Sequence, residues 1–451
     1  MEKHGIAVAT ICTDEFFALG KAEAEALGMA GLPIAVVPHP VAKLPAARVA
    51  ELAAGAVDEI VHIFGTDAAA LQAEHRAKTV EVKSKLRYHS MFESNFNAPD
   101  SPQRLKGPDS WEAINRLFYR RGWTDGLPIV EPTPERCARM LAETGFDANE
   151  VLGLVEPRLG EATVGKVAVN AVMAGCEPAH LPVLVAAVRA MVQPQLNLKA
   201  LQTTTHPCTL LALVNGPAAE ALDINGTYNC MGQGAMANAT IGRAIRLVLL
   251  NIGGAAPGIL DRATMGTPAK YSFCFSENAA ESPWEPLHVE RGFDAGQSTV
   301  TMCGVEGPHN VNEHYGRSAE EILLAIGGTM ATPGVNNSYL RGEIIVAFGP
   351  EHAEIVARDG FSKDDVRRFL AERAIIPAWH ISEAQGKLYW ERVPDRFIGA
   401  KGEGGLHIVT RPEEVMIVVA GGAGRHSAVI PSFGTTRSVT VPILDATGKP
   451  M

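Results

Sequence analysis

Two residues near the start of the chain, Cys12 and His39, stand where thiol chemistry could take place. Cys12 ends an apolar stretch predicted as a strand over 6–12, directly before a helix predicted over 13–27. A helix N-terminus lowers the pKa of a nearby thiol, and two acidic residues in the first turn oppose that effect. His39 follows the second predicted strand, 32–37, at the edge of a parallel sheet where ligands bind. We therefore expect Cys12 to be catalytic and His39 to line the same cleft. The alternative for Cys12 is an inert cysteine in the core.

A group of acidic, basic and aromatic residues follows a short strand-like segment in the middle of the chain. It contains Glu277, Glu281 and His288, whose side chains can exchange protons with a substrate. Asn278 and Trp284 lie between them, and we expect both to contact the substrate. The alternative is a solvated acidic loop, against which stand the large aromatic residues and the small number of lysines.

The segment 306–314 is dense in side chains that bind protons, metals or substrates. Its sequence is Glu-Gly-Pro-His-Asn-Val-Asn-Glu-His. His309 and Glu313 would be neighbours on a helix, but the Gly-Pro pair and the two asparagines favour a loop. We expect a substrate-contacting loop rather than a metal site, with His309 as a catalytic acid–base group.

A glycine-rich turn over 421–427 directly follows a predicted strand and is a candidate anion site. Backbone N–H groups in such turns can approach an anion closely, and Arg425 adds a positive charge. The spacing matches neither a Walker A loop nor the full dinucleotide fingerprint. We expect the turn to hold the carboxylate or phosphate of a small substrate, or else to be a tight structural turn. The substrate-binding residues expected here and on a buried helix predicted over 238–251 are Gly422, Gly424, Arg425, His426, Asn238 and Arg243.

His206, Cys208 and Cys230 have the side-chain types that soft transition metals prefer. The first two are only two residues apart and the third is distant, so no recognised zinc spacing is present. We favour a pocket wall built from glycine-rich loops. A transition metal held by these three residues and His314 is the alternative, and the sequence does not otherwise identify a cofactor.

The elements that would position these residues predict an α/β fold. The first 80 residues read strand–helix–strand–helix, too few strands for a parallel sheet that is covered on both faces. A linker is predicted over 81–108, where the apolar period is lost and Asn, Ser and Pro accumulate. Over 109–451, three apolar strands run into glycine-rich turns and then helix-like segments. We expect an incomplete parallel-sheet unit followed by a large α/β domain, and the recurring units suggest an internal duplication. The three strands are predicted over 210–214, 344–348 and 415–420.

Composition sets limits on the partners of the protein. The chain of 451 residues carries a net charge of −10, which argues against binding nucleic acid or an anionic membrane. No stretch approaches the roughly 18 apolar residues of a membrane span, and we expect no signal peptide. The seven cysteines include no Cys-x-x-Cys pair, so we expect a reduced, cytoplasmic protein.

Several of these stretches resemble the UGSC family, a bacterial family of selenoproteins and their cysteine-containing relatives. Segments 9–16 and 32–40 resemble the second half of the UGSC domain. The family's defining motif is selenocysteine or cysteine followed by Gly-Ser-Cys. It lies upstream of the stretch that resembles the Cys12 segment, and this chain has no Gly-Ser-Cys. The resemblance implies that the motif is lost or sits on a separate small subunit that completes the sheet, and we expect the second. The rest of the chain resembles the large domain often associated with the family, through 170–176, 237–244, 270–278, 282–293 and the His426 turn.

Three functions remain open from the sequence. The first is the large subunit of a heteromeric enzyme, of higher oligomeric order, that acts on a small polar molecule by thiol-dependent redox or sulfur/carbon-bond chemistry. Such an oxidoreductase, lyase or transferase would have a small subunit carrying the Cys/Sec-Gly-Ser-Cys motif as its partner. The second function is a self-sufficient metal-dependent lyase or hydrolase that uses His206, Cys208, Cys230, His309 and His314. The third is a non-catalytic scaffold.

Overall fold

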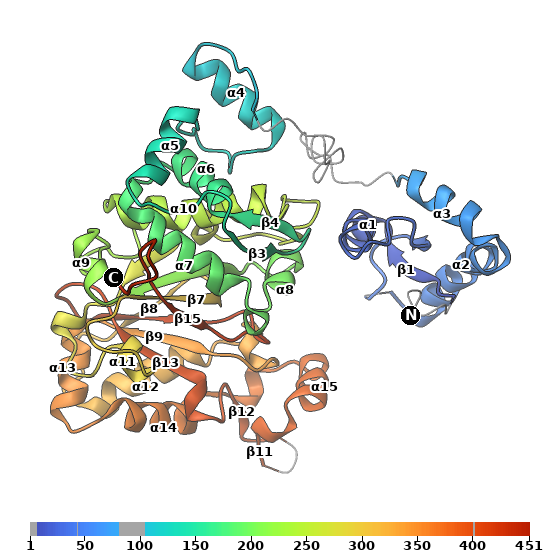
Figure 1. Ribbon diagram of the computed structural model, residues 1–451. Coiled ribbons are helices and arrows are strands. Elements are labelled where there is room, and N and C mark those ends of the chain that lie inside the picture. Colours follow the sequence, from blue (N-terminus) through green and yellow to red (C-terminus); the bar gives the residue numbers. More distant parts are fainter. Residues whose placement is uncertain (1–6, 43, 81–103, 400–401) are drawn as a thin grey trace.

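The N-terminal unit is built on a sheet of two parallel strands. The computed structural model describes residues 7–42, 44–80, 104–399 and 402–451. Strand β1 (Thr10–Thr13) pairs in parallel with β2 (Ile34–Val37), and Cys12 lies opposite Val36. Three helices surround the pair (Figure 1): α1 (Phe17–Ala26), α2 (Ala46–Gly65) and α3 (Ala68–Ala77).

The two edges of this small sheet differ. On the outer edge of β2, the N–H groups of Ile34 and Val36 donate to the side chains of His75 and Glu59 (3.3 and 3.1 Å). These contacts close that edge to further strands. In β1 the N–H of Thr10 donates toward β2, to the carbonyl of Pro33 (3.2 Å). Strand geometry alternates, so the next N–H points outward. Within the described residues no side chain caps the outer edge of β1.

Helix α1 packs the N-terminal unit against the rest of the chain. Ala22 belongs to the main apolar core, and Glu23 forms an ion pair with Lys199 of α8 (Leu198–Thr203). Glu15 lies 3.4 Å from the Arg262 guanidinium. The two parts therefore share an apolar contact and two ion pairs.

The large domain contains two four-stranded sheets with the same pattern of strand directions. Their orders are β6-β5-β7-β15 and β13-β9-β14-β8, and each has one parallel pair followed by two antiparallel pairs. The strands are β5 (Thr209–Asn215), β6 (Cys274–Ser276), β7 (Thr299–Val305), β15 (Val439–Pro442), β8 (His309–Asn312), β9 (Ile344–Phe348), β13 (Val415–Val419) and β14 (His426–Ile430).

The fourth strand of each sheet comes from the other half of the chain. Strand β8 directly follows β7 but joins the second sheet, and β15 follows β14 but joins the first. This exchange ties the two sheets together through the chain itself. The matching patterns agree with an internal duplication, which stays a prediction.

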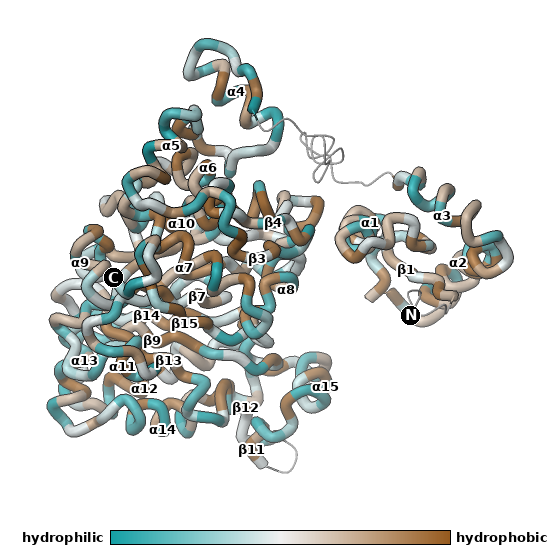
Figure 2. Tube along the Cα trace, viewed as in Figure 1, coloured by the Kyte–Doolittle hydropathy of each residue, from teal (hydrophilic) through white to brown (hydrophobic). Residues whose placement is uncertain are grey.

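The two sheets pack face to face and are covered by helices on their outer faces. Alternate residues such as Leu211, Leu213, Val418 and Ile430 form the apolar layer between the sheets. Figure 1 shows α6 (Val164–Ala174), α7 (Leu181–Met191) and α10 (Met236–Asn251) on one side, with α12 (Ala319–Met330) and α14 (Lys363–Arg373) on the other. The hydrophobic residues concentrate in these layers (Figure 2). The α/β fold expected from the sequence is confirmed as a four-layer arrangement.

Shorter elements complete the domain. The remaining helices are α4 (Trp111–Arg121), α5 (Pro134–Ala142), α9 (Pro217–Ala221), α11 (Leu287–Glu290), α13 (Pro350–Arg358) and α15 (Glu383–Arg392). The remaining strands are β3 (Val151–Val155), β4 (Gly160–Thr163), β10 (Ile375–Ile376), β11 (Phe397–Ile398) and β12 (Gly405–His407). No helix of the described residues is long and apolar enough to cross a membrane.

Two local predictions are wrong and one lies largely outside the described residues. The third glycine-rich turn leads into β14 rather than a helix, because the residues after it alternate and pair with β8 and β9. The segment 306–314 is not wholly a loop, since its centre forms β8 against β14. Most of the predicted linker, residues 81–103, is outside the described residues.

The apolar layer between the sheets should dominate the stability of the large domain. Leu213 is fully buried there, so Leu213→Ala leaves a cavity and should lower the free energy of unfolding by about 2–5 kcal/mol. Leu324, on α12, is 49% exposed, and Leu324→Ala should cost less than about 1 kcal/mol. Denaturant unfolding of both variants measures the difference, and equal effects would contradict the layer arrangement.

Candidate functional site

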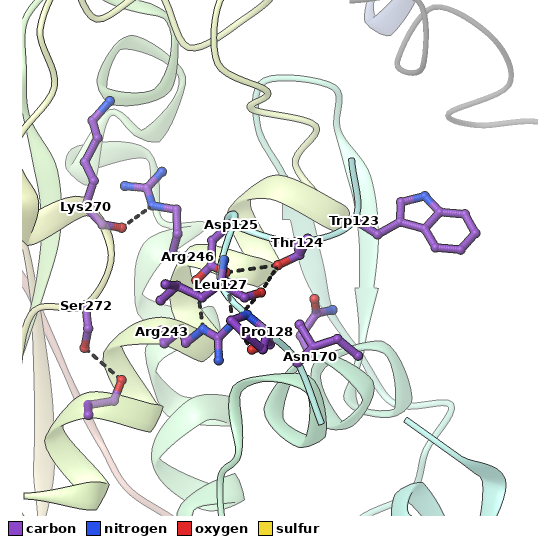
Figure 3. A network of polar contacts seen from close by, with 12 residues as sticks. Trp123, Thr124, Asp125, Leu127, Pro128, Asn170, Arg243, Arg246, Lys270 and Ser272 are labelled. Atoms are coloured by element: carbon purple, nitrogen blue, oxygen red, sulfur yellow. Dashed lines mark hydrogen bonds and ion pairs between the residues drawn. The ribbon is translucent and has the colours of Figure 1, made fainter. Parts of the chain in front are cut away.

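A cavity of about 610 Å³ lies beside the C-terminal half of α10. Its wall combines three segments that are distant in sequence: the end of α4 with the turn after it, α10, and the long loop before β6. Charged side chains are set into this wall (Figure 3). The charged residues that line it are Asp125, Arg246, Asp261 and Lys270.

The turn after α4 is held by an ion pair. Helix α4 ends at Gly122, whose φ of 68° is a left-handed conformation that favours glycine. The Asp125 carboxylate accepts two hydrogen bonds from the Arg243 guanidinium, at 2.8 and 2.9 Å. Arg243 also donates to the carbonyl of Pro128 (2.8 Å). Figure 3 shows this bidentate arrangement, which orients both groups. Arg243, expected to bind substrate, instead positions a wall of the cavity.

Arg246 places a positive charge at the cavity without a hydrogen-bonded carboxylate among the described residues. Its guanidinium donates to the Lys270 carbonyl (2.9 Å), the Gln202 side chain (3.3 Å) and the Thr209 hydroxyl (3.2 Å). These acceptors are neutral and use three of the five N–H groups. Burial lowers the pKa of Arg246. The arrangement can bind an anionic group of a small molecule.

Lys270 and Asp261 form a second charged pair on the cavity wall. The ammonium group lies 2.6 and 2.8 Å from the two carboxylate oxygens. Both side chains are less than one fifth exposed. Since one partner can donate a proton and the other can accept one, this pair is suited to acid–base chemistry on a bound molecule.

Arg262, next to this pair, connects the cavity to the N-terminal unit. It donates to the carbonyl of Gly258, a residue of the cavity wall. Its guanidinium carbon lies 5.0 Å from the centre of the Phe16 ring, and that ring is 5.7 Å from the His39 ring. The carboxyl ends of β1 and β2 are thereby joined to the rim of the cavity through contacts of the Arg262, Phe16 and His39 side chains.

Cys12 lies at this strand edge, but its surroundings do not favour a thiolate. Partial burial raises the pKa of the Cys12 thiol to about 11; Lys78 opposes the shift, and Asp14 and Glu59 add to it. The helix start expected to lower the pKa is a single 3-10 turn in which Thr13 makes no side-chain cap. Thr13 instead contacts Nδ1 of His39 (3.2 Å). The two strand ends do meet, while the expected activation of Cys12 is absent.

Glu277 is buried within the large domain, away from the residues that line the cavity. One carboxylate oxygen accepts hydrogen bonds from Asn215 (2.5 Å) and from the N–H of Leu287 (2.8 Å). The other oxygen is buried and has no hydrogen-bond partner among the residues that the structure describes. Burial raises the pKa of Glu277, against the opposing effect of the Lys363 charge.

The other residues expected around Glu277 have separate structural contacts. The Asn278 side-chain amide donates a hydrogen bond to the Gly421 carbonyl (3.0 Å). The Trp284 indole N–H donates to the Phe361 carbonyl (2.9 Å). His288 is buried with one ring nitrogen unpaired, and burial lowers its pKa. Glu281 is exposed. Asn238 lies on α10, where its amide bonds the backbone of Asn225 and Cys230 (2.8–3.1 Å).

The glycine-rich turn already holds a carboxylate from its own chain. The N–H of Gly424 donates to Glu351 (2.8 Å), and Arg425 lies 3.6 Å from the same carboxylate. At Gly422, a Cβ would lie 2.4 Å from the Tyr228 ring, so the missing side chain makes room for an aromatic residue. The Glu351 carboxylate of this chain thus occupies the turn in which the sequence predicted an anionic group of the substrate.

The residues expected to hold a metal are not brought together. Cys208 is buried and contacts the Leu201 carbonyl (3.5 Å), and burial raises its pKa to about 12. Burial also raises the pKa of Cys230. His206 pairs with Glu306 (2.9 Å). No group of three or more His, Cys, Asp or Glu in the described residues is arranged around one ion.

His309 lies at the start of β8, whereas His314 and His426 lie together at the other end of the β8–β14 pairing. His309 lies opposite Val429 and is exposed. Nε2 of His314 lies 3.2 Å from Nε2 of His426. The sequence assigned these three residues to catalysis, metal binding and substrate binding, and the structure places two of them in direct contact.

Sequence reasoning missed most of the charged residues of the cavity. It proposed no site role for Asp125, Asp261, Arg262 or Lys270. It placed Arg246 on a predicted helix without giving it a role in a site. One signal was available, namely charged residues close in sequence to glycine or proline. Asp125 is followed by Gly-Leu-Pro, and Asp261 and Arg262 come soon after Gly258. Such runs commonly form shaped loops.

The fold and the cavity define an α/β protein with a charged cavity beside a small parallel-sheet unit. Residues 1–66 match the model of the UGSC family, which confirms the resemblance for the N-terminal part of the chain. A search of curated proteins found no match.

The raised pKa of Cys12 makes its reactivity testable. With a pKa of about 11, about one thousandth of the molecules carry a thiolate at pH 8. Alkylation of Cys12 by iodoacetamide, followed by mass spectrometry of its peptide, should therefore accelerate about tenfold per pH unit from pH 7 to 9.5. A plateau below pH 9 would show an activated thiol instead.

The buried carboxyl group of Glu277 should make stability depend on pH. Its pKa is raised above the ordinary 4.5, so it favours the folded state most at low pH and loses that contribution as the pH rises through the raised value. Glu277→Gln should abolish this loss, so its stability relative to wild type should increase with pH. Denaturant unfolding between pH 4 and 9 measures the trend. Glu281→Gln, at an exposed position, is the control, and parallel curves for wild type and Glu277→Gln would contradict the assignment.

Proposed function

We propose that this chain is the large subunit of a heteromeric enzyme that acts on a small polar molecule. The chemistry is thiol-dependent redox or sulfur/carbon-bond chemistry, and a partner small subunit with a Cys/Sec-Gly-Ser-Cys motif supplies the reactive thiol. The cavity beside α10 is the site that we assign to the substrate.

The observation that carries this proposal is the contact between the N-terminal unit and the cavity rim. Arg262 donates a hydrogen bond to the carbonyl of Gly258 on the wall and lies over the Phe16 ring, which contacts the His39 ring. A reactive group placed beyond the ends of β1 and β2 would therefore lie near the cavity. Cys12 itself has a raised pKa, which favours the role of neighbour to a reactive thiol over that of nucleophile.

The open edge of β1 supports a partner chain at the same place. The edge of β2 is closed by His75 and Glu59, whereas the outward backbone groups of β1 have no side-chain partner among the described residues and Ile11 is exposed. A partner strand can add to such an edge by main-chain hydrogen bonds. It would lie directly beside Cys12.

The large domain would supply binding and acid–base groups. Arg246 has N–H groups left for an anionic part of the substrate, and the Lys270–Asp261 pair can exchange a proton with it. Glu277, Glu281, His288 and His309, the earlier candidates for this work, do not line the cavity. We place the protein in a reducing cytoplasm because all seven cysteines are free.

Removal of one outward N–H from β1 tests the partner. Ile11→Pro deletes that donor and leaves the N–H groups that face β2 in place, so it should reduce recovery of the small subunit at least tenfold. The matched control Ile11→Thr keeps the N–H and a β-branched side chain. Tagged wild-type and variant chains are purified from their native cells, and the captured polypeptides are identified by mass spectrometry.

The wild-type chain should capture a small polypeptide that carries the Cys/Sec-Gly-Ser-Cys motif, and Ile11→Thr should retain it. A wild-type chain that is isolated alone, or that captures only polypeptides without the motif, would overturn the proposal. Equal recovery by Ile11→Pro, with an unchanged circular dichroism spectrum, would show that the partner does not use this edge.

A further inference from the structure

Two exposed histidines face each other where the ends of β8 and β14 meet. Nε2 of His314 lies 3.2 Å from Nε2 of His426, and the two rings are nearly perpendicular, at 82°. Two nitrogens that bind one tetrahedral zinc ion, each about 2.05 Å away, lie about 3.3 Å apart. The spacing is therefore that of two ligands on one edge of a metal tetrahedron.

A neighbouring asparagine fixes the state of one ring. Nδ1 of His426 lies 2.9 Å from Oδ1 of Asn310, a diagonal neighbour across the paired strands. An amide oxygen only accepts hydrogen bonds, so Nδ1 carries the proton and Nε2 of the neutral ring presents a lone pair. Metal-binding histidines are commonly oriented in this way, by a hydrogen bond from the ring nitrogen that does not bind the metal. Without a metal, Nε2–H of His314 can donate to the same lone pair.

The backbone that carries His314 is fastened on both sides. Arg425 donates to the carbonyls of His314 and Gly316, at 2.8 and 2.9 Å. The Glu313 carboxylate accepts from the N–H groups of Tyr315 and Gly316, and His352 donates to the Glu313 carbonyl. The backbone at His314 is thus held in place before a metal binds, which reduces the entropy lost on binding.

We infer that His314 and His426 form a binding site for a divalent transition metal such as Zn²⁺. Imidazole nitrogen is a preferred ligand of Zn²⁺, Ni²⁺ and Cu²⁺. Because no third His, Cys, Asp or Glu of the described residues joins the pair, water or a donor atom of another molecule fills the remaining positions. The metal ion is therefore open to exchange of these ligands, unlike one in a closed structural site. This site is independent of the proposed function at the cavity.

Calorimetric titration of the full chain with Zn²⁺, after treatment with a chelator, tests the inference. Wild type should bind Zn²⁺, and His314→Ala and His426→Ala should each lose one equivalent. Asn310→Ala should weaken that equivalent by about tenfold or more, because it removes the orienting contact. His309→Ala is the matched control. His309 lies next to Asn310 on β8 and is exposed, and this variant should bind Zn²⁺ like wild type.

Titration with Co²⁺ adds a spectroscopic readout of the ligands. Wild type should develop visible absorption bands that are absent from His426→Ala. Equal stoichiometry and affinity for Zn²⁺ in wild type, His314→Ala and His426→Ala would overturn the inference. So would no binding to wild type, which would leave a hydrogen bond as the sole interaction between the rings.

Discussion

The large domain depends on burying both faces of two sheets at once. Strands β5, β7, β9 and β13 are buried along their whole length, because helices cover their outer faces and the opposite sheet covers their inner faces. Buried polar side chains on these strands need hydrogen-bond partners, as the Thr301 hydroxyl on β7 has in the Thr440 hydroxyl (2.9 Å). The charged candidates for chemistry lie outside the buried strands, on helix α10 or in connecting loops, and the exchange of β8 and β15 holds the two sheets in one unit.

Most of the polar groups at these strand ends already have partners within the chain. Glu351 occupies the glycine-rich turn, Asn238 binds the backbone of its own loop, and Asn278 binds the carbonyl of Gly421. Arg246 differs, because its hydrogen-bond acceptors are all neutral. The cavity beside α10 therefore offers a guanidinium with no carboxylate hydrogen-bonded to it among the described residues, whereas Glu351 already occupies the glycine-rich turn.

The sequence predicts the elements better than it predicts the site. The runs at 210–214, 344–348 and 415–420 are strands because continuous apolar segments bounded by glycine are a strong local signal. The partition into two sheets, with β8 and β15 exchanged, is set by long-range packing that no local pattern contains. The cavity could not be predicted for the same reason: Asp125 and Arg243 are 118 residues apart and meet only in the folded chain. The His314–His426 contact spans 112 residues in the same way.

In the proposed function, a partner chain adds to β1 and brings its thiol to the cavity rim. Hydrogen–deuterium exchange of the full chain, with and without the small subunit that carries the Cys/Sec-Gly-Ser-Cys motif, tests both parts together. The account predicts slower exchange at Thr10–Thr13 and in the rim segment 255–271, with little change in the buried strands of the two sheets. A complex that leaves exchange at β1 and at the rim unchanged would contradict it.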